Sequence, residues 1–370
     1  MNKIALIFLT ITGLIAYFIG TMFIPVLFVG LLPRVFAWLI HLSLFSIVFL
    51  GPFISRSDFK LNQKLHQFLQ FCSYTLMGFY MIFLFFLICK SIVLIWVMNL
   101  EVELTLLSLI MSIVTTFLGF FVTLKKPSLI NVGIKLPPQA LDLNGLKMVQ
   151  LSDVHVSGTI KKPFVEKIVA EANAQNPDLI LLTGDFIDGL PEDLREDLSP
   201  FKNLKSKYGV FYCPGNHEYY WGFENWMQEF RNLNFEVLLN QAKIIQIGNN
   251  KIAVGGVHDL ASHRINKNYQ CNPDVAFENC NEVDYKILLA HQPKSVHLIK
   301  KAKVDLVLSG HTHAGQFFPG SLFIFLFQPY VKGLHLINGI QMYINQGTGY
   351  WGPPNRFGTK SEITILTLQS

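Results

Sequence analysis

Two shortages in the sequence exclude whole classes of function. The five cysteines are odd in number and unpaired in spacing, so neither a disulfide framework nor a thiolate metal site is expected. The C-terminal region also lacks a surplus of basic residues. Lys and Arg outnumber Asp and Glu by 8 to 3 in residues 1–126, but residues 127–370 hold 22 of each kind. Nucleic-acid binding needs a basic surface, so no nucleic-acid partner is expected for the C-terminal region.

The N-terminal third contains long runs with hardly any charge. Mean hydropathy of the chain is +0.37, and the apolar excess lies in four segments that each reach the roughly 20 residues of a membrane-spanning helix: 4–32, 35–54, 68–97 and 104–124. The first segment is too long for a signal peptide and no small-residue cleavage site follows it, which indicates a retained anchor. Residues 1–126 are therefore predicted to form an all-α bundle of four transmembrane helices.

Charged residues in the connectors predict the orientation of this bundle. Basic residues occur between the second and third segments and after the fourth, whereas acidic residues separate the third from the fourth: Arg56, Lys60 and Lys64; Lys125 and Lys126; Glu101 and Glu103. Because loops rich in Lys and Arg stay in the cytoplasm, we expect a multi-pass protein of the cell membrane whose C-terminal domain is cytoplasmic. Lys90 and His41 are the only ionisable residues well inside the predicted spans, and a transport pathway usually contains more.

The pattern changes after a linker predicted at residues 127–145, which contains Pro137 and Pro138. Short apolar runs that end in polar clusters then recur, and they are typical of buried strands: LKMVQLSDVH, PDLILLTGDFID, GVFYCPGNHE, YKILLAHQP and VDLVLSGHTH. Helices are expected near 162–174, 191–204 and 222–233, with antiparallel strands and tight turns later in the chain. Residues 146–370 are therefore predicted to be one α+β domain.

Polar side chains at the carboxyl ends of these strands are expected to converge, because ligand sites of open α/β sheets gather there. The set holds carboxylates, imidazoles and one amide: Asp153, His155, Asp185, Asp188, Asn216, His217, His291, His311 and His313. Such ligands suit Mn, Fe or Zn, with Mg a further candidate. A single ion would leave several of them crowded without partners, so two divalent metal ions are predicted, an arrangement that serves phosphoester hydrolysis.

Taken singly, several of these residues have simpler explanations. Asp153 could cap the helix expected near residue 162, and Asn216 and Asp188 could form turns. His291 could be a structural histidine held by hydrogen bonds. These explanations would require an independent coincidence for every residue. The joint occurrence of all nine residues is therefore the reason to prefer a metal centre.

The motifs and their order resemble a known family. D-V-H, G-D-F-I-D, G-N-H-E, the His of LLAHQP and G-H-T-H resemble the five ordered motifs of the calcineurin-like metallophosphoesterase superfamily. The blocks GHTHAGQ and NQGTGYWGPPNRFGTKSEI resemble its membrane-associated bacterial branch. The resemblance covers about residues 146–370 and implies a four-layer αββα sandwich there. Residues 1–126, with the four predicted transmembrane helices, fall outside the resemblance.

The resemblance also implies a role for each residue. The two metal-ligand sets would share Asp185 as a bridge: Asp153, His155 and His313 for one ion; Asn216, His291 and His311 for the other. His217 would be a catalytic residue beside the leaving-group oxygen, and Asp188 would orient its imidazole. Arg356, in the branch-specific block, is expected to bind substrate phosphate through its planar guanidinium, with a loop salt bridge as the alternative.

These expectations combine into a membrane-anchored phosphoesterase that cleaves a phosphate ester or pyrophosphate bond with a metal-bridging hydroxide. The lipid bilayer is its expected partner, and a lipid or lipid-linked substrate of the UDP-2,3-diacylglucosamine type is favoured, because four spans are a large investment for an enzyme of diffusing esters. Three alternatives stay open: a phosphoesterase of soluble nucleotides or phosphodiesters, a non-catalytic membrane sensor or scaffold that binds phosphate ligands, and a transporter with a hydrolase domain.

Overall fold

The computed structural model describes residues 3–49 and 62–370, which belong to two compact units. The helical unit is drawn from Met1–Val122 together with Gly352–Phe357. The sheet unit comprises Thr123–Trp351 and Gly358–Ser370. Because a short segment near the C-terminus belongs to the helical unit, the chain passes between the two units three times.

The helical unit is built from long apolar helices: α1 (Lys3–Leu27), α2 (Leu31–Ile47), α4 (Gln63–Leu94), η1 (Met98–Leu100) and α5 (Glu101–Leu124). Three stretches are long and apolar enough to cross a membrane: Thr10–Leu27, Lys64–Leu94 and Met98–Leu124. At 17 residues, α2 is an apolar helix of shorter length. The prediction of four transmembrane helices is therefore approximate, since three of the described helices qualify.

The boundaries predicted for the first two apolar segments are wrong. One span was expected over 4–32 and the next over 35–54, but α1 ends at Leu27 and α2 begins at Leu31. The break falls at Gly30, whose φ of 88° is a left-handed conformation that suits glycine and cannot continue a helix. Residues 50–54 of the second segment lie outside the described residues.

Two ionisable side chains lie inside the helical unit and are hydrogen-bonded there. Lys90 Nζ donates to the Met22 carbonyl at 2.8 Å and to Thr105 Oγ1 at 3.1 Å. The Nε2 atom of His41 lies 2.9 Å from the Ala16 carbonyl oxygen. Each side chain thus links two or three helices, because a buried polar group that lacked a partner would be costly.

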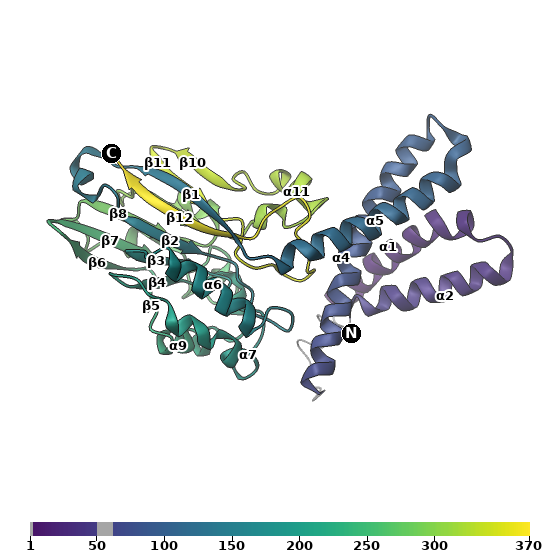
Figure 1. Ribbon diagram of the computed structural model, residues 1–370, viewed down its shortest axis with the longest axis horizontal. Coiled ribbons are helices and arrows are strands. Elements are labelled where there is room, and N and C mark those ends of the chain that lie inside the picture. The colour runs from purple at the N-terminus through teal and green to yellow at the C-terminus, as the bar shows by residue number, and fades with distance from the viewer. Residues whose placement is uncertain (1–2, 50–61) are drawn as a thin grey trace. The chain divides into compact units, whose positions relative to one another are not determined.

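The sheet unit contains two six-stranded sheets (Figure 1). In spatial order the first sheet comprises β1 (Ser128–Lys135), β12 (Glu362–Gln369), β2 (Lys147–Leu151), β3 (Leu179–Thr183), β4 (Val210–Cys213) and β5 (Glu236–Val237). The second comprises β10 (Gly333–Ile337), β11 (Ile340–Ile344), β9 (Leu306–Ser309), β8 (Tyr285–Leu289), β7 (Asn250–Gly256) and β6 (Gln241–Ile247).

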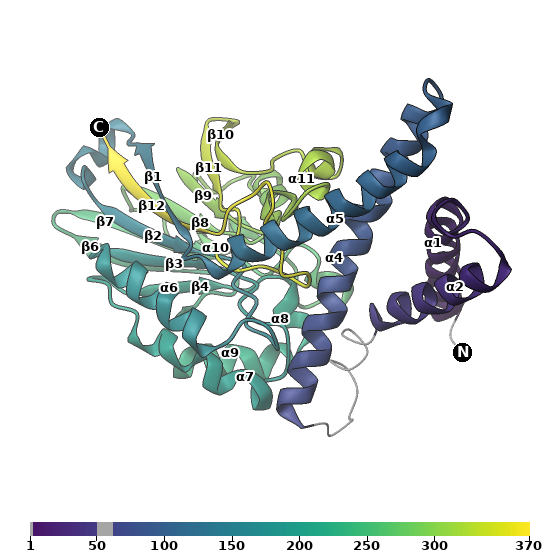
Figure 2. The same cartoon turned by 45° about the vertical axis from the view of Figure 1, so that its right-hand side comes forward.

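Most neighbouring strands at the centre of each sheet are parallel, and parallel strands need crossover connections. Strands β2 to β5 run parallel, as do β7, β8, β9 and β11. The crossovers of the first sheet hold α6 (Lys162–Ala174), α7 (Pro191–Leu198), η3 (Ser199–Asn203), α8 (Asn216–Tyr220) and α9 (Phe223–Asn232). Figure 2 shows α6, α7 and α9 on one side of that sheet. All three expected helices are therefore present, the second as α7 followed by η3.

Alternation along the strands produces the layers. Met148 packs in a core between the sheets with Ile287 and Leu308, whereas its neighbour Val149 packs with Ile168 of α6 on the outer face. The outer face of the second sheet is covered by α10 (Pro273–Ala276) and η5 (Pro293–Leu298), which contribute Ala276 and Val296 to a third core. The order helix, sheet, sheet, helix is the predicted four-layer sandwich.

The prediction of a linker at residues 127–145 needs correction. Strand β1 pairs with β12 along its whole length, from Ser128 opposite Glu362 to Lys135 opposite Gln369, and η2 (Pro138–Leu143) follows it. Within β1 the alternate residues Ile130, Val132 and Ile134 are the more buried ones, as expected for a strand that covers a core with one face. These residues therefore extend the first sheet.

Candidate metal centre

The nine residues predicted to converge all follow strands of the sheet unit. Asp153 and His155 come after β2, Asp185 and Asp188 after β3, and Asn216 and His217 begin α8 after β4. The other three follow the second sheet, with His291 after β8 and both His311 and His313 after β9. Both sheets thus contribute the carboxyl ends of parallel strands, which is where ligand sites form in such sheets.

Backbone conformation supports a special role for these loops. Five of the nine residues have positive φ values, between 48° and 70°: Asp153, His155, Asp185, His311 and His313. Residues other than glycine rarely adopt this conformation, and it persists only where the surroundings impose it. The Asp153 and His155 amides donate to the carbonyls of Gly184 and Asp185 at 2.9 and 3.1 Å, so the loops after β2 and β3 hold each other in place.

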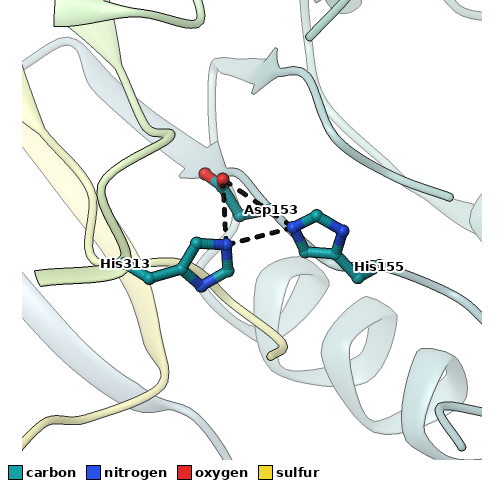
Figure 3. Close-up of side chains that lie close together, drawn as sticks. All are labelled: Asp153, His155 and His313. Atoms are coloured by element: carbon teal, nitrogen blue, oxygen red, sulfur yellow. Dashed lines mark hydrogen bonds and ion pairs between the residues drawn. The ribbon is translucent and has the colours of Figure 1, made fainter. Parts of the chain in front are cut away.

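One cluster is formed by Asp153, His155 and His313, which are all buried (Figure 3). His313 Nε2 lies 3.2 Å from Asp153 Oδ1 and 3.0 Å from His155 Nε2. In Figure 3 the carboxylate and both rings point toward one another, with Asp153 and His155 on the loop after β2 and His313 on the loop after β9. Two imidazole nitrogens and a carboxylate oxygen that face one point in space are a donor set for a cation.

A second cluster is formed by Asp185, His291 and His311. His291 Nε2 lies 3.0 Å from Asp185 Oδ2 and 3.3 Å from His311 Nδ1. Asp185 Oδ2 also lies 4.0 Å from His155 Nε2 and 3.8 Å from His217 Nε2, and these three residues form a third cluster. Asp185 therefore stands between the two ligand sets, where a shared ligand would have to be.

The pKa shifts in these clusters indicate a site that favours positive charge beside its carboxylates. Burial would raise the pKa of the Asp153 carboxyl, but the imidazoles of His313 and His291 lower it below its ordinary value. Burial likewise lowers the pKa of His291, and the carboxylates of Asp185 and Asp153 outweigh that effect and raise it well above its usual range. Burial and the neighbouring His291 instead lower the pKa of His311 to about 4.

Two observations fit a pair of bound cations. The His155 and His313 nitrogens approach each other beside a carboxylate, as described above. In addition, the Asn216 Oδ1 atom is buried and has no hydrogen-bond partner among the described residues. A buried carbonyl oxygen that lacks a partner is costly, and coordination of a metal would satisfy it.

His217 and Asp188 form a pair next to the clusters. His217 Nδ1 contacts Asp188 Oδ1 closely, and the other carboxylate oxygen of Asp188 lies 3.0 Å from His155 Nδ1. Burial opposes ionisation of Asp188, but the two imidazoles lower the pKa of its carboxyl to about 2. Burial also lowers the pKa of His217, and the carboxylates of Asp188 and Asp185 outweigh it and raise the pKa to about 10. Asp188 therefore orients two imidazoles at once.

Backbone and side-chain groups behind the clusters hold the candidate ligands in place. The buried Glu218 carboxylate accepts hydrogen bonds from the amides of Gly215, Asp185 and Phe186 at 2.7, 3.0 and 2.7 Å. The Thr183 carbonyl oxygen lies 2.7 Å from His291 Nδ1, which leaves His291 Nε2 free to face the cluster. Glu218 is the last residue of the G-N-H-E motif, whereas nothing in the sequence signalled the contact of Thr183.

The half-exposed Trp351 lies at the edge of this site. The centroid of its ring is 5.7 Å from the centroid of the His217 ring. The centroid of the Tyr220 ring is 5.4 Å from the same point. Gln316 holds the Trp351 backbone, with Nε2 donating to its carbonyl at 2.7 Å and Oε1 accepting from its amide at 2.8 Å. Both residues lie in the blocks that resemble the bacterial branch, but their pairing could not be read from sequence.

Three other polar residues stand apart from the clusters. Arg356 belongs to the helical unit, where its amide donates to the Gly119 carbonyl at 3.1 Å, so its role in substrate binding stays a prediction. His258 and Asp259 are in none of the three clusters found among the described residues. The Nδ1 atom of His258 lies 2.7 Å from the Tyr219 hydroxyl, and Asp259 accepts from Gln292 Nε2 at 2.9 Å, which are structural contacts.

Comparisons with known proteins agree with this geometry. Residues 146–315 match the family described as Calcineurin-like phosphoesterase. An uncharacterized metallophosphoesterase of Helicobacter pylori is 42% identical over 68% of this chain and 66% of its own length. An uncharacterized metallophosphoesterase of Campylobacter jejuni is 35% identical over 74% of this chain and 71% of its own. A zebrafish protein (Danio rerio) named transmembrane protein with metallophosphoesterase domain is 33% identical over 72% and 62%. The chain thus spans slightly less than two thirds of the Helicobacter relative.

Proposed function

Because the chain belongs to the calcineurin-like phosphoesterase family, we propose that it is a membrane-anchored phosphoester hydrolase that works with two divalent metal ions. The observation that carries this proposal is the position of Asp185 between two buried clusters of imidazoles and carboxylates. Relatives named as transmembrane proteins and three helices of sufficient length and apolarity support the membrane anchor.

The residues of each cluster suit a metal ion. Asp153, His155 and His313 would hold one ion, and Asn216, His291 and His311 the other, with Asp185 shared. Nitrogen and oxygen ligands without thiolates favour Mn, Fe or Zn. When bound, such a pair of ions supplies a water molecule that is acidic enough to act as hydroxide at neutral pH, and it stabilises negative charge on phosphate oxygens.

The proposed role of His217 is to hold a proton for the leaving group. Its pKa of about 10 keeps the imidazole protonated at neutral pH, and Asp188 fixes the ring by contact with Nδ1. The Nε2 atom is then the one that can donate a proton to the leaving oxygen as the ester bond breaks.

We further propose that the substrate is a lipid or a lipid-linked phosphate. The support is the apolar helical unit, which would keep the hydrolase at a bilayer and raise its effective concentration toward substrates held there. Hydrolysis of soluble nucleotides or phosphodiesters is the competing substrate class, and a sensor that binds phosphate ligands without turnover is the non-catalytic alternative.

A substrate panel tests this proposal. The full chain, purified and supplied with Mn, is assayed on an acylated phosphodiester in vesicles, a soluble nucleotide and bis(p-nitrophenyl) phosphate. We expect the acylated ester to be hydrolysed at least about tenfold faster in kcat/KM, equivalent to about 1.4 kcal/mol of transition-state binding. Equal rates on soluble nucleotides would contradict the lipid substrate, and binding without hydrolysis of any ester would favour the sensor.

Asp185→Asn tests the metal centre itself. The amide has one acceptor oxygen and no charge, so we expect the variant to lose at least about 10³-fold in activity and to retain less than two metal ions per chain by elemental analysis. Asp142→Asn, at an exposed position outside the clusters, serves as the matched control and should retain both. Full activity of Asp185→Asn would contradict the assigned centre.

A further inference from the structure

An apolar surface lies on the chain directly after the candidate metal ligands. It comprises α11 (Gly320–Phe323), η7 (Ile324–Leu326) and Phe327, and we call it the apolar tip. Five large apolar side chains in six consecutive positions are exposed there: Leu322 by 48%, Phe323 by 44%, Phe325 by 64%, Leu326 by 65% and Phe327 by 71%. Elsewhere in the sheet unit the exposed large apolar residues that the structure describes stand singly or on alternate strand positions. A concentrated patch of this kind marks an interaction surface.

The apolar tip has a defined backbone structure. Within it and at its start, amides find carbonyl partners at 2.9 to 3.0 Å, from Ser321 to Phe317, from Leu322 to Pro319 and from Phe327 to Ile324. Its side chains are therefore displayed by a folded turn, and their exposure is not the result of an unformed segment. Burying these side chains would remove apolar area from water without breaking any of these hydrogen bonds.

Both ends of this loop are fixed close to the metal ligands. Gly315, two residues after His313, lies so close to Gly320 that a Cβ on Gly315 would be 2.5 Å from the Gly320 carbonyl oxygen. At the far end of the loop, the Val331 carbonyl accepts a hydrogen bond of 2.5 Å from the Thr312 hydroxyl, and Thr312 stands between His311 and His313. Whatever holds the apolar tip therefore also holds the metal ligands at a short and fixed distance from it.

The stretch of chain that contains the apolar tip carries charge of one sign. No Asp or Glu occurs in residues 306–361, whereas this stretch contains Lys332 and Lys360, which are both exposed. The amine of Lys294 also donates to the Phe327 carbonyl at 3.1 Å, which places a cation directly at the apolar tip. Large apolar side chains in a stretch of chain with basic residues and no acidic ones are typical of surfaces that insert into the headgroup region of anionic membranes.

We propose that the apolar tip is a membrane-docking element, which inserts into the headgroup and upper acyl region of an anionic bilayer and thereby holds the metal centre at the lipid surface. The apolar helices of the same chain argue for a bilayer as the occupant, because they would keep the sheet unit near one. The role in delivering lipid substrates rests on the proposed function, whereas insertion itself requires no hydrolysis.

Photo-crosslinking of the full chain in vesicles tests the proposal. The residue p-benzoylphenylalanine replaces Phe325 in one variant and, as the control, Ile244 in another. Ile244 is 46% exposed and lies in β6, an edge strand of the second sheet, whereas the apolar tip precedes β10, the opposite edge strand of that sheet. After illumination in vesicles that contain phosphatidylglycerol, we expect the lipid adduct on the Phe325 variant to exceed that on the Ile244 variant at least fivefold, with at least a twofold drop when phosphatidylcholine replaces phosphatidylglycerol.

The outcomes separate this inference from the proposed function. Equal lipid adducts at the two positions, or a crosslinked dimer in place of a lipid adduct at position 325, would overturn membrane docking. An adduct yield that is the same with phosphatidylglycerol and with phosphatidylcholine would overturn the role assigned to the basic residues. Because crosslinking requires no turnover, lipid adducts on a chain that hydrolyses no ester would sustain docking while the proposed hydrolase failed.

Discussion

At the scale of residues, His217 depends on its partner Asp188. An imidazole alone could rotate and would lose its proton near neutral pH, whereas the carboxylate of Asp188 fixes the Nδ1 atom and stabilises the charged ring. The same carboxylate reaches His155, a candidate metal ligand, with its second oxygen. The proton donor and the metal site are therefore coupled through one side chain.

The variant Asp188→Asn should reveal this coupling in the pH dependence. Removal of the carboxylate lowers the pKa of His217, so its proton is lost at lower pH and the alkaline limb of the kcat/KM profile moves to lower pH. We also expect kcat/KM at neutral pH to fall by about 10²-fold. His217→Gln should remove the alkaline limb altogether, and an unchanged limb in Asp188→Asn would argue against His217 as the proton donor.

Glycines at the centre provide close approach. A Cβ on Gly310 would overlap Ser152 Oγ and Asp153 Oδ2, so only glycine lets the loop after β9 reach the loop after β2. We expect Gly310→Ala to reduce the free energy of unfolding by about 3 kcal/mol and to weaken metal retention, as measured by denaturant unfolding and elemental analysis.

Gly189→Ala is the matched control for that variant. The nearest atom to a Cβ at Gly189 is Leu194 Cδ1 at 2.9 Å, the end of a flexible side chain that can move. The expected loss is within about 1 kcal/mol. If the two alanine variants proved equally stable and equally able to retain metal, the close contact at Gly310 would not matter.

At the scale of elements, the strands that position the centre could be predicted from sequence, whereas the edge strand β1 could not. Parallel strands buried on both faces are continuous apolar runs, and β3 and β9 are clear in LILLT and LVLS for that reason. Strand β1 is covered on one face only and follows the apolar helices, so the weaker alternation of its sequence resembles that of a linker. Its partner β12 stands at the other end of the chain, and local patterns do not report such distant pairing.

The candidate site divides in the same way. The carboxylates and imidazoles that face the clusters could be named from sequence, because their residue types and spacing follow from the strand ends. The contacts behind them could not, because each has a backbone group on at least one side. Thr183 contributes a carbonyl to His291 and Gln316 pairs with the backbone of Trp351, and neither contact depends on a sequence pattern.

For the whole molecule, metal binding should contribute to stability. A ligand that binds only the folded state at a hundred times its Kd adds about 2.7 kcal/mol, and for a domain of this size each kcal/mol corresponds to about 2–4 °C in Tm. We therefore expect a chelator to lower the Tm of the sheet unit by about 5–10 °C, and added Mn to restore it. No change in Tm on chelation of metal-loaded protein would contradict a centre that is bound only in the folded state.

The side of the membrane on which the sheet unit lies is a separate prediction for the whole molecule. The basic residues after the last apolar helix predict the cytoplasmic side. A fluorescent protein that folds only in the cytoplasm, fused after Lys126, should therefore give signal, and a reporter that is active only outside should not. The reverse pair of signals would place the hydrolase on the outer face.

The passage of Gly352–Phe357 through the helical unit has a practical consequence for dissecting this protein. A cut after Lys126 looks like a clean way to obtain a soluble hydrolase, but it discards Gly119, whose carbonyl receives the Arg356 amide. The excised fragment would keep Gly352–Phe357, which directly follow Trp351 in the chain, but would lack the helices to which these six residues belong. Separate expression of the two halves would therefore leave the helical unit incomplete, and the full-length protein in a lipid environment is the form to study.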